Sequence, residues 1–259
     1  MKYAIVNGIK KEATKGLKGI CPICGKELIA KCGNFKVNHW AHKVKDACDN
    51  WWENETLWHR KWKNYFPIEM QEKVMFDETK KEKHIADICT NHNLIIEFQH
   101  SSIKYEEKIS RELFYKNLIW VVDGTRLKSD YQRFVSGKYN LLCNNNDFAI
   151  LSCNSSVLPC SWEKNNVPVC FDFSGCDDPR YYIYCFLPYK FDDNIILVRM
   201  TKQTFINYVL NNQIVSLLRT LIIEINKNEQ NRINLMAKHN QRIIFPVRRY
   251  YPYRRKFRF

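Results

Sequence analysis

Residues 85–99, Ile-Ala-Asp-Ile-Cys-Thr-Asn-His-Asn-Leu-Ile-Ile-Glu-Phe-Gln, contain two apolar runs separated by the turn formers Asn91-His92-Asn93. Two runs of strand length around such a turn predict a β-hairpin. Each run carries one carboxylate, Asp87 in the first and Glu97 in the second. A carboxylate within an apolar strand is costly unless it is paired or binds a metal. The hairpin therefore has the layout of a two-carboxylate metal site, with a salt-bridged pair as the alternative.

The residues around the hairpin predict a helix, three strands, a helix and a strand. Residues 52–66 lack Gly and Pro and end against Pro67, which favours a helix. The other expected elements are strands over 68–76, 83–90 and 94–99, a helix over 105–116 and a strand over 118–122. We expect an α/β core with the order αβββαβ.

The first helix of this core is expected to carry polar residues toward the hairpin. Glu55, His59 and Lys63 follow one another at intervals of four residues and so line one helix face. Alone, such a stripe is typical of a solvated helix face, but the neighbouring carboxylates favour a role in the site. Gln99 lies two residues beyond Glu97 and shares its side of the strand. Two carboxylates with an open coordination sphere suit Mg²⁺, or Mn²⁺ in its place, and phosphodiester hydrolysis.

The N-terminal residues carry a second candidate metal site. Cys21 and Cys24 are followed by His39 and His42, and two such pairs are what tetrahedral Zn²⁺ requires. Substitute ligands are available in Cys32 and Cys48. Four protein ligands close the coordination sphere, so the predicted zinc is structural. Buried thiols with two surface histidines are the alternative.

The composition indicates in which compartment the protein works and what kind of partner it binds. The 259 residues include eleven cysteines and carry a formal net charge of +14. No signal peptide and no long uncharged apolar run is apparent, so we expect a cytoplasmic protein with reduced thiols and without a membrane partner. The strong positive charge indicates nucleic acid as the partner.

An ordered series of motifs resembles the competence protein CoiA-like family. Its members are Cys21-x2-Cys24, His39-Trp40-Ala41-His42, Glu55-x3-His59-x3-Lys63, Ala86-Asp87-Ile88, Glu97-Phe98-Gln99-x-Ser101, Arg111-x3-Tyr115 and Ile119-Trp120. The resemblance spans about residues 18–123 and implies a restriction-endonuclease-like nuclease of the PD-(D/E)xK superfamily, with a mixed sheet. It implies that Asp87 and Glu97 hold the metal and that Glu55, His59 and Lys63 complete the site. It further implies that Ser101, Arg111 and Tyr115 support the site or bind the phosphate backbone.

One position departs from the superfamily pattern. Gln99 stands where the superfamily usually has lysine, and its amide can orient a water but supplies no charge. Lys63 or Lys104 could supply that charge instead. A catalytically inactive module that binds DNA or assists recombination is the alternative function.

The second half of the chain predicts an α+β accessory region without a recognisable motif. Strands are expected over 148–152, 181–187 and 195–200, and helix over 201–239 with a break at Asn211-Asn212. Its cysteines are expected to be buried free thiols, with Cys170 and Cys176 the only pair suggestive of a second zinc. In the Arg- and Tyr-rich end, nucleic-acid contacts are predicted for Arg248, Arg249, Arg254 and Arg255, and a solvated terminus is the alternative.

The predicted organisation is a zinc-binding module (1–50), a nuclease core (51–124), an accessory region (125–241) and a basic aromatic tail (242–259). The predicted function is a metal-dependent nuclease acting on nucleic acid, with DNA favoured, single- or double-stranded. The resemblance leaves DNA processing in competence and defence against phage DNA equally open. The sequence lacks a phosphate-binding Gly-x4-Gly-Lys-Ser/Thr loop, so an ATPase or helicase would be a separate partner.

Overall fold

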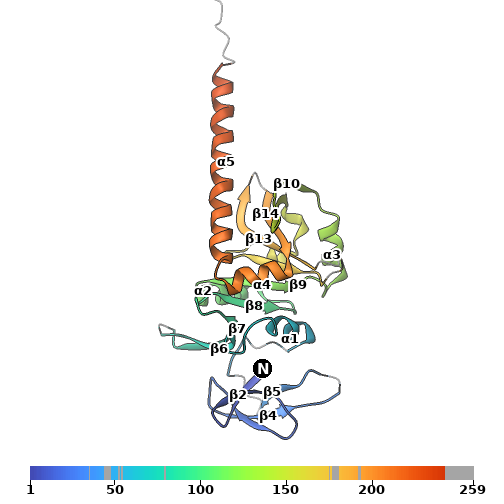
Figure 1. Cartoon of the computed structure of the whole chain (residues 1–259), viewed down its shortest axis with the longest axis vertical. Coiled ribbons are helices and arrows are strands. Elements are labelled where there is room, and N and C mark those ends of the chain that lie inside the picture. The colour runs from blue at the N-terminus through green and yellow to red at the C-terminus, as the bar shows by residue number, and fades with distance from the viewer. Residues whose placement is uncertain are drawn as a thin grey trace, which may run out of the picture. The chain divides into compact units, whose positions relative to one another are not determined.

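The computed structural model describes residues 1–34, 36–43, 48–51, 53, 55–78, 80–174, 176, 181–191 and 194–242. It divides into two compact units, Met1–Leu218 and Arg219–Phe259. Within the described ranges, the first unit holds two β-sheets, four complete α-helices and the start of helix α5 (Ile214–Arg242), and the described part of the second unit is the continuation of α5 (Figure 1). None of the helices in the described ranges has an apolar stretch long enough to cross a membrane.

The N-terminal residues form a five-stranded antiparallel sheet in the order β2-β1-β3-β4-β5. The strands are β1 (Tyr3–Val6), β2 (Ile9–Glu12), β3 (Lys18–Ile20), β4 (Glu27–Lys31) and β5 (His39–His42). Asn7 and Gly8 join the first two strands with φ angles of 52° and 77°, as a two-residue hairpin turn requires. Trp40 is buried with Ala4 and Leu28 in the small core of this sheet.

The larger sheet has nine strands in the order β10-β11-β14-β13-β12-β9-β8-β7-β6. Strand β9 is parallel to both β8 and β12, and the other pairs are antiparallel, so the sheet is mixed as predicted. Figure 1 traces β6 to β9 in sequence through this sheet. Every residue of β9 is buried, which explains why its residues 118–122 are all apolar.

The predicted element order αβββαβ is confirmed. The six elements are α1 (Leu57–Lys63), β6 (Gln71–Asp77), β7 (Glu82–Cys89), β8 (Ile95–Gln99), α2 (Tyr105–Phe114) and β9 (Leu118–Asp123). Helix α1 is shorter than the expected 52–66, because Thr56 caps its N-terminus: the Thr56 side chain accepts a hydrogen bond from the His59 amide, and Thr56 is itself extended. Glu55 therefore precedes the helix and does not lie on it.

The sheet continues without interruption beyond the predicted division at residue 124. Strand β9 pairs with β12 (Val169–Asp172), with Trp120 opposite Val169. The remaining elements are α3 (Lys128–Val135), β10 (Tyr139–Asn144), β11 (Phe148–Asn154), two short 3₁₀ turns (Ser155–Val157 and Cys160–Trp162), β13 (Tyr182–Phe191), β14 (Asn194–Thr201) and α4 (Lys202–Leu210). The strands expected near 148–152, 181–187 and 195–200 are confirmed. So is the helix break, where Asn212 has a φ of 58°.

Two cysteines of this region are paired in a way that the sequence did not indicate. Cys170 and Cys185 lie directly opposite each other on β12 and β13 and are joined by a disulfide. Cys170 is therefore not free to share a metal with Cys176, which is exposed. The expectation of free thiols at Cys170 and Cys185, and the suggested Cys170–Cys176 zinc pair, are wrong. The thiols of this region are free and buried at Cys153, but exposed at Cys143, Cys160 and Cys176.

Candidate active site

The two predicted carboxylates meet where the β7–β8 hairpin opens. The strands pair through Ile88 with Ile96 and Cys89 with Ile95. At the next position the backbone amide of Asp87 donates to Glu97 Oε1 at 3.1 Å, and the amide of Phe98 donates to Asp87 Oδ2 at 3.0 Å. The carboxylates thus take the place of strand carbonyls as acceptors, and both lie on one side of the sheet.

A buried cation accompanies each carboxylate. Lys63 Nζ lies 2.9 Å from Asp87 Oδ1, 2.9 Å from Glu72 Oε1 and 3.5 Å from Glu55 Oε2. Burial by itself would lower the pKa of Lys63, but the charges of Asp87, Glu72 and Glu55 outweigh burial and raise that pKa well above its ordinary value. Lys63 is therefore held as an ammonium group. Lys104, the other lysine considered, is exposed at the start of α2.

Arg111 is the cation beside Glu97. Its Nη1 donates to Glu97 Oε2 at 3.0 Å, and its Nη2 donates to the Trp51 carbonyl at 2.6 Å and to Glu107 at 2.5 Å. Burial, followed by the charge of Asp87, nevertheless raises the pKa of Glu97 to about 8. Near neutral pH the Glu97 carboxyl therefore keeps its proton, and a cation bound beside it would favour the ionised form.

Two residues predicted to bind nucleic acid are buried. Arg111 and Tyr115 are 5% and 2% exposed, so they face the interior and not a phosphate backbone at the surface. The hydroxyl of Tyr115 has no hydrogen-bond partner among the described residues, and burial raises the pKa of Tyr115 well above its ordinary value. The buried placement of Arg111 and Tyr115 fits the expected role of supporting the site, and does not fit binding of a phosphate backbone.

His59 is fixed through both ring nitrogens. The Thr56 backbone amide donates to Nδ1 at 3.3 Å, and Nε2 lies 3.1 Å from the carbonyl oxygen of Phe98. Because an amide can only donate and a carbonyl can only accept, the proton is on Nε2. His59 therefore ties α1 to β8 one residue beyond Glu97.

Gln99 is bound by the predicted residue Ser101 and by Glu53, which was not predicted. Its Nε2 donates to Glu53 Oε2 at 3.0 Å and to the Ser101 carbonyl at 3.1 Å, while the Ser101 amide donates to Glu53 Oε1 at 2.6 Å. Gln99 Oε1 is buried without a partner in the part of the chain that the structure describes. A buried amide oxygen of this kind is an acceptor available to a water or a cation.

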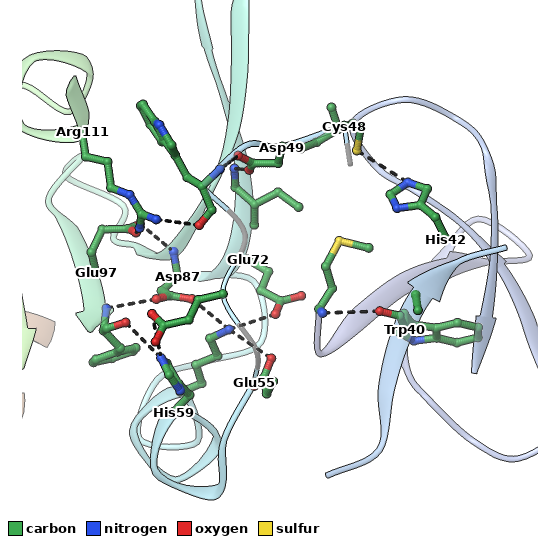
Figure 2. Close-up of a pocket in the computed structure, with 18 residues that line it drawn as sticks. Trp40, His42, Cys48, Asp49, Glu55, His59, Glu72, Asp87, Glu97 and Arg111 are labelled. Atoms are coloured by element: carbon green, nitrogen blue, oxygen red, sulfur yellow. Dashed lines mark hydrogen bonds and ion pairs between the residues drawn. The ribbon is translucent and has the colours of Figure 1, made fainter. Parts of the chain in front are cut away.

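A cavity of about 370 Å³ lies between the N-terminal sheet and the β7–β8 hairpin. Asp87, Glu97, Lys63 and Arg111 line it, whereas Gln99 is not among its lining residues. Figure 2 shows Glu55, Glu72, Asp87 and Glu97 gathered on one side of it, with His42 and Cys48 across from them. Lys63 and Arg111 are the lysine and the arginine among the lining residues, whereas the carboxylates are Asp49, Glu53, Glu55, Glu72, Asp87 and Glu97. Asp49, Glu53 and Glu72 were missed in the sequence, because single acidic residues outside a periodic pattern carry no signal there.

The N-terminal cysteine and histidine cluster differs from prediction in one member. The ligand atoms of Cys21, Cys24, His42 and Cys48 all lie within 4.8 Å of one another. The fourth member is thus Cys48 and not His39, whose Nδ1 lies 2.8 Å from the Val37 carbonyl. Gly25 has the φ of 70° expected of a knuckle, and its amide donates to the Cys21 carbonyl at 3.0 Å. Cys32 lies apart, with its thiol 3.7 Å from the Ala13 carbonyl.

The two sites suit different metals. Three thiols and one imidazole in a tight group suit Zn²⁺ in a closed site. Asp87 and Glu97 form a pair of oxygen donors, and the described ranges contain no further group of three clustered ligands besides the cysteine site. Mg²⁺ is commonly held by one or two carboxylates with water and substrate phosphate, so a pair beside excess negative charge fits it.

The residues thus define an α/β protein with a mixed sheet, a Cys₃His cluster and a carboxylate-lined cavity. A family model described as competence protein CoiA, N-terminal domain, matches residues 7–50, and one described as competence protein CoiA, nuclease-like domain, matches residues 57–150. Together they cover just over half of the chain, which belongs to the CoiA-like competence protein family. No curated protein and no solved structure matches the chain significantly. The predicted tail contacts Arg248, Arg249, Arg254 and Arg255 lie outside the described residues.

Proposed function

We propose that this chain is a metal-dependent nuclease that hydrolyses phosphodiester bonds, with DNA as substrate. The observation that carries the proposal is the opposition of Asp87 and Glu97 at the open end of the β7–β8 hairpin, each beside its own buried cation and both lining one cavity. The nuclease-like domain match over residues 57–150 supports it. The αβββαβ order supports a restriction-endonuclease-like core of the PD-(D/E)xK type.

Asp87 and Glu97 are the residues that would hold Mg²⁺ or Mn²⁺. The bound ion would lower the pKa of a water and stabilise negative charge on the phosphate. Glu55 stands 3.5 Å from Lys63 and is a further carboxylate within reach of the cavity. The surplus of carboxylates over Lys63 and Arg111 is the local feature that a divalent cation would balance.

Lys63 is proposed to do the work of the lysine that Gln99 replaces. Its ammonium group reaches Asp87 Oδ1 from helix α1, so a positive charge stands at the carboxylate pair although β8 supplies none. Gln99, by contrast, is bound to Glu53 and Ser101, and we assign its free Oε1 as an acceptor for a water at the site. With Lys63 supplying the positive charge and Gln99 accepting a hydrogen bond from a water, the site would be active without a lysine on β8.

The remaining predicted residues hold this arrangement. His59 orients β8 through the Phe98 carbonyl, and because both its ring nitrogens are engaged, we propose it as a positioning residue and not as a base. Arg111 fixes Glu97, and Tyr115 and Ser101 pack or bond beside them. The Cys₃His cluster would hold a structural Zn²⁺.

The charge of the chain supports nucleic acid as the partner. A formal net charge of +14, concentrated in part in the Arg-rich residues 242–259, favours binding to phosphate backbones, single- or double-stranded. The family match favours DNA handling in competence over defence against phage DNA. Any ATPase or helicase would act as a separate protein.

The proposal is tested by incubating the full chain with labelled DNA and RNA, single- and double-stranded, in Mg²⁺, Mn²⁺ or chelator. We expect metal-dependent cutting that is lost in Asp87→Asn and Glu97→Gln, while nucleic-acid binding is retained. These replacements keep an acceptor oxygen for the backbone amides that each carboxylate binds. Glu106→Gln, an exposed acid at the start of α2, is the control and should cut normally. Binding without any metal-dependent cutting in the wild type would refute the enzyme and favour a DNA-binding or recombination-assisting module.

A further inference from the structure

A short segment connects the Cys₃His cluster to the candidate active site. It comprises residues 48–55 and is described at 48–51, 53 and 55. It begins at the cluster member Cys48 and ends immediately before Thr56, the N-cap of α1. Its odd-numbered residues from 49 to 55 all line the carboxylate cavity.

Asp49 is the first of these contacts and binds the strand that carries Asp87. Its Oδ2 accepts from the Ile85 amide at 3.0 Å, and its Oδ1 lies 2.8 Å from His84 Nδ1. The same Oδ1 accepts from the Trp51 amide at 3.0 Å, which turns the segment toward the hairpin. Asp49 therefore anchors β7 two residues before Asp87 and is itself adjacent to a cluster member.

Trp51 makes the second contact. Its carbonyl accepts from Arg111 Nη2 at 2.6 Å, and its ring stacks on His84 with centroids 3.3 Å apart. Arg111 in turn donates to Glu97. The segment thereby fixes the cation that accompanies the second carboxylate.

Glu53 makes the third contact, on β8 and just beyond it. One oxygen accepts from the Ser101 amide and the other from Gln99 Nε2, and the latter oxygen lies 3.7 Å from His59 Nε2. Glu53 is thus the residue that holds Gln99 with its Oε1 free. Each of the three groups around the carboxylate pair, β7, Arg111 and Gln99, has a partner in this one segment.

We propose that Asp49 and Glu53 are positioning residues of the candidate nuclease site, and that a metal bound by Cys21, Cys24, His42 and Cys48 holds them in place. This inference rests on the proposed function for its catalytic consequence. A bound metal would tie Cys48 to His42 of β5 and to Cys21 and Cys24 between β3 and β4, and so would fix the upstream end of the segment, while the Thr56 cap fixes the downstream end. Without the metal, the contacts of Asp49 must order a segment that is anchored at one end only.

The first test measures amide hydrogen exchange in the full chain, with zinc bound, after removal of zinc by a chelator, and after its return. The probes are the amides of Ile85 and Ser101, because each donates to a side chain of the segment. We expect both to exchange about tenfold faster without zinc, the factor for losing a hydrogen bond of ordinary strength, and to recover when zinc is restored. The amides of β14 in the same unit should keep their protection, which excludes general unfolding. Unchanged exchange at Ile85 and Ser101 in zinc-free protein would overturn the inference.

The second test uses substitutions in the segment with zinc retained. Asp49→Ala and Glu53→Gln should lower kcat for cutting about tenfold or more while the KM for DNA changes by less than about twofold, since neither residue is assigned to bind DNA. Asn50→Ala is the matched control, because Asn50 lies in the same segment and is exposed. A rise in KM with unchanged kcat would contradict a positioning role. If the wild type cuts nothing, the proposed function fails, and the exchange experiment still decides whether the cluster orders the site.

Discussion

Glu72 joins the N-terminal sheet to the core that carries the candidate site, and its substitution gives the sharpest test of the structure. Its two carboxylate oxygens accept from the backbone amides of Lys2 and Tyr3 at 2.7 and 2.9 Å, and Lys63 Nζ lies 2.9 Å from Oε1. Glu72 also has a φ of 45°, a conformation that a non-glycine residue keeps only when its surroundings enforce it. In Glu72→Gln one of the two oxygens becomes an amide group, which cannot accept from a backbone N–H.

The magnitude follows from the pKa of Glu72. Burial opposes ionisation, but the charge of Lys63, the charge of the N-terminal ammonium group and the two backbone donors outweigh it and lower the pKa of Glu72 from 4.5 to about 2. Because the folded pKa is depressed, the stabilisation is fully present above pH 4.5 and is lost as the pH falls toward 2. The difference corresponds to about 3 kcal/mol at neutral pH, of which about 2 kcal/mol is lost between pH 7 and pH 3.

The assay is urea unfolding of wild type and Glu72→Gln at pH 7 and at pH 3. We expect the variant to be less stable by about 3 kcal/mol at pH 7 and by about 1 kcal/mol at pH 3. Glu69→Gln is the matched control, since Glu69 is exposed three residues earlier, and it should change the free energy of unfolding by less than about 0.5 kcal/mol. A loss of unfolding free energy below about 1 kcal/mol at pH 7, or a loss at pH 3 that is as large as the loss at pH 7, would refute the role assigned to Glu72.

Three further substitutions test the site. Elemental analysis of His39→Ala should still find about one zinc per chain, whereas Cys48→Ala should contain less zinc. The reverse result would favour His39 as the fourth ligand, as expected from the sequence. Lys63→Met should lower the cutting rate about a hundredfold or more in a nuclease assay, because it removes the positive charge at Asp87. The control Lys104→Met should cut at the wild-type rate. An equal loss of cutting rate in both variants would reject Lys63 as the substitute for the superfamily lysine. Arg111→Lys should lower the free energy of unfolding by about 1–3 kcal/mol, because one ammonium group cannot reach Glu97, Glu107 and the Trp51 carbonyl together. An unchanged midpoint of thermal unfolding would count against the stabilising role of these three hydrogen bonds.

The core elements were predictable because their signals are local. The apolar runs on either side of Asn91–Asn93 specified the hairpin, and helical and strand periodicity specified the order from α1 to β9. The start of α1 was placed too early because its capping box uses Thr56 with His59, where the usual pattern has Glu or Gln at the second position. The Asn7-Gly8 turn was a signal that the sequence did contain and that could have revealed the first hairpin.

Other features depend on contacts between distant residues and have no local signature. The choice of Cys48 over His39 depends on the placement of Cys48 beside Cys21, Cys24 and His42, and spacing alone favoured His39. The pairing of β9 with β12 joins residues far apart in the chain, so the sheet extends past the division expected at residue 124. Glu72 acquires its role only because β1 docks against it.

The manner in which Asp87 and Glu97 bridge β7 and β8 limits how a nuclease of the proposed kind could lose its activity during evolution. Each side chain serves as an acceptor for a backbone amide of the facing hairpin strands, so replacement by a small residue would leave a buried N–H unpaired at about 1–3 kcal/mol each. A descendant that stopped cutting yet stayed folded would therefore pass through Asn at position 87 or Gln at position 97. An inert relative would be marked by amides at these positions, and its sheet would be preserved.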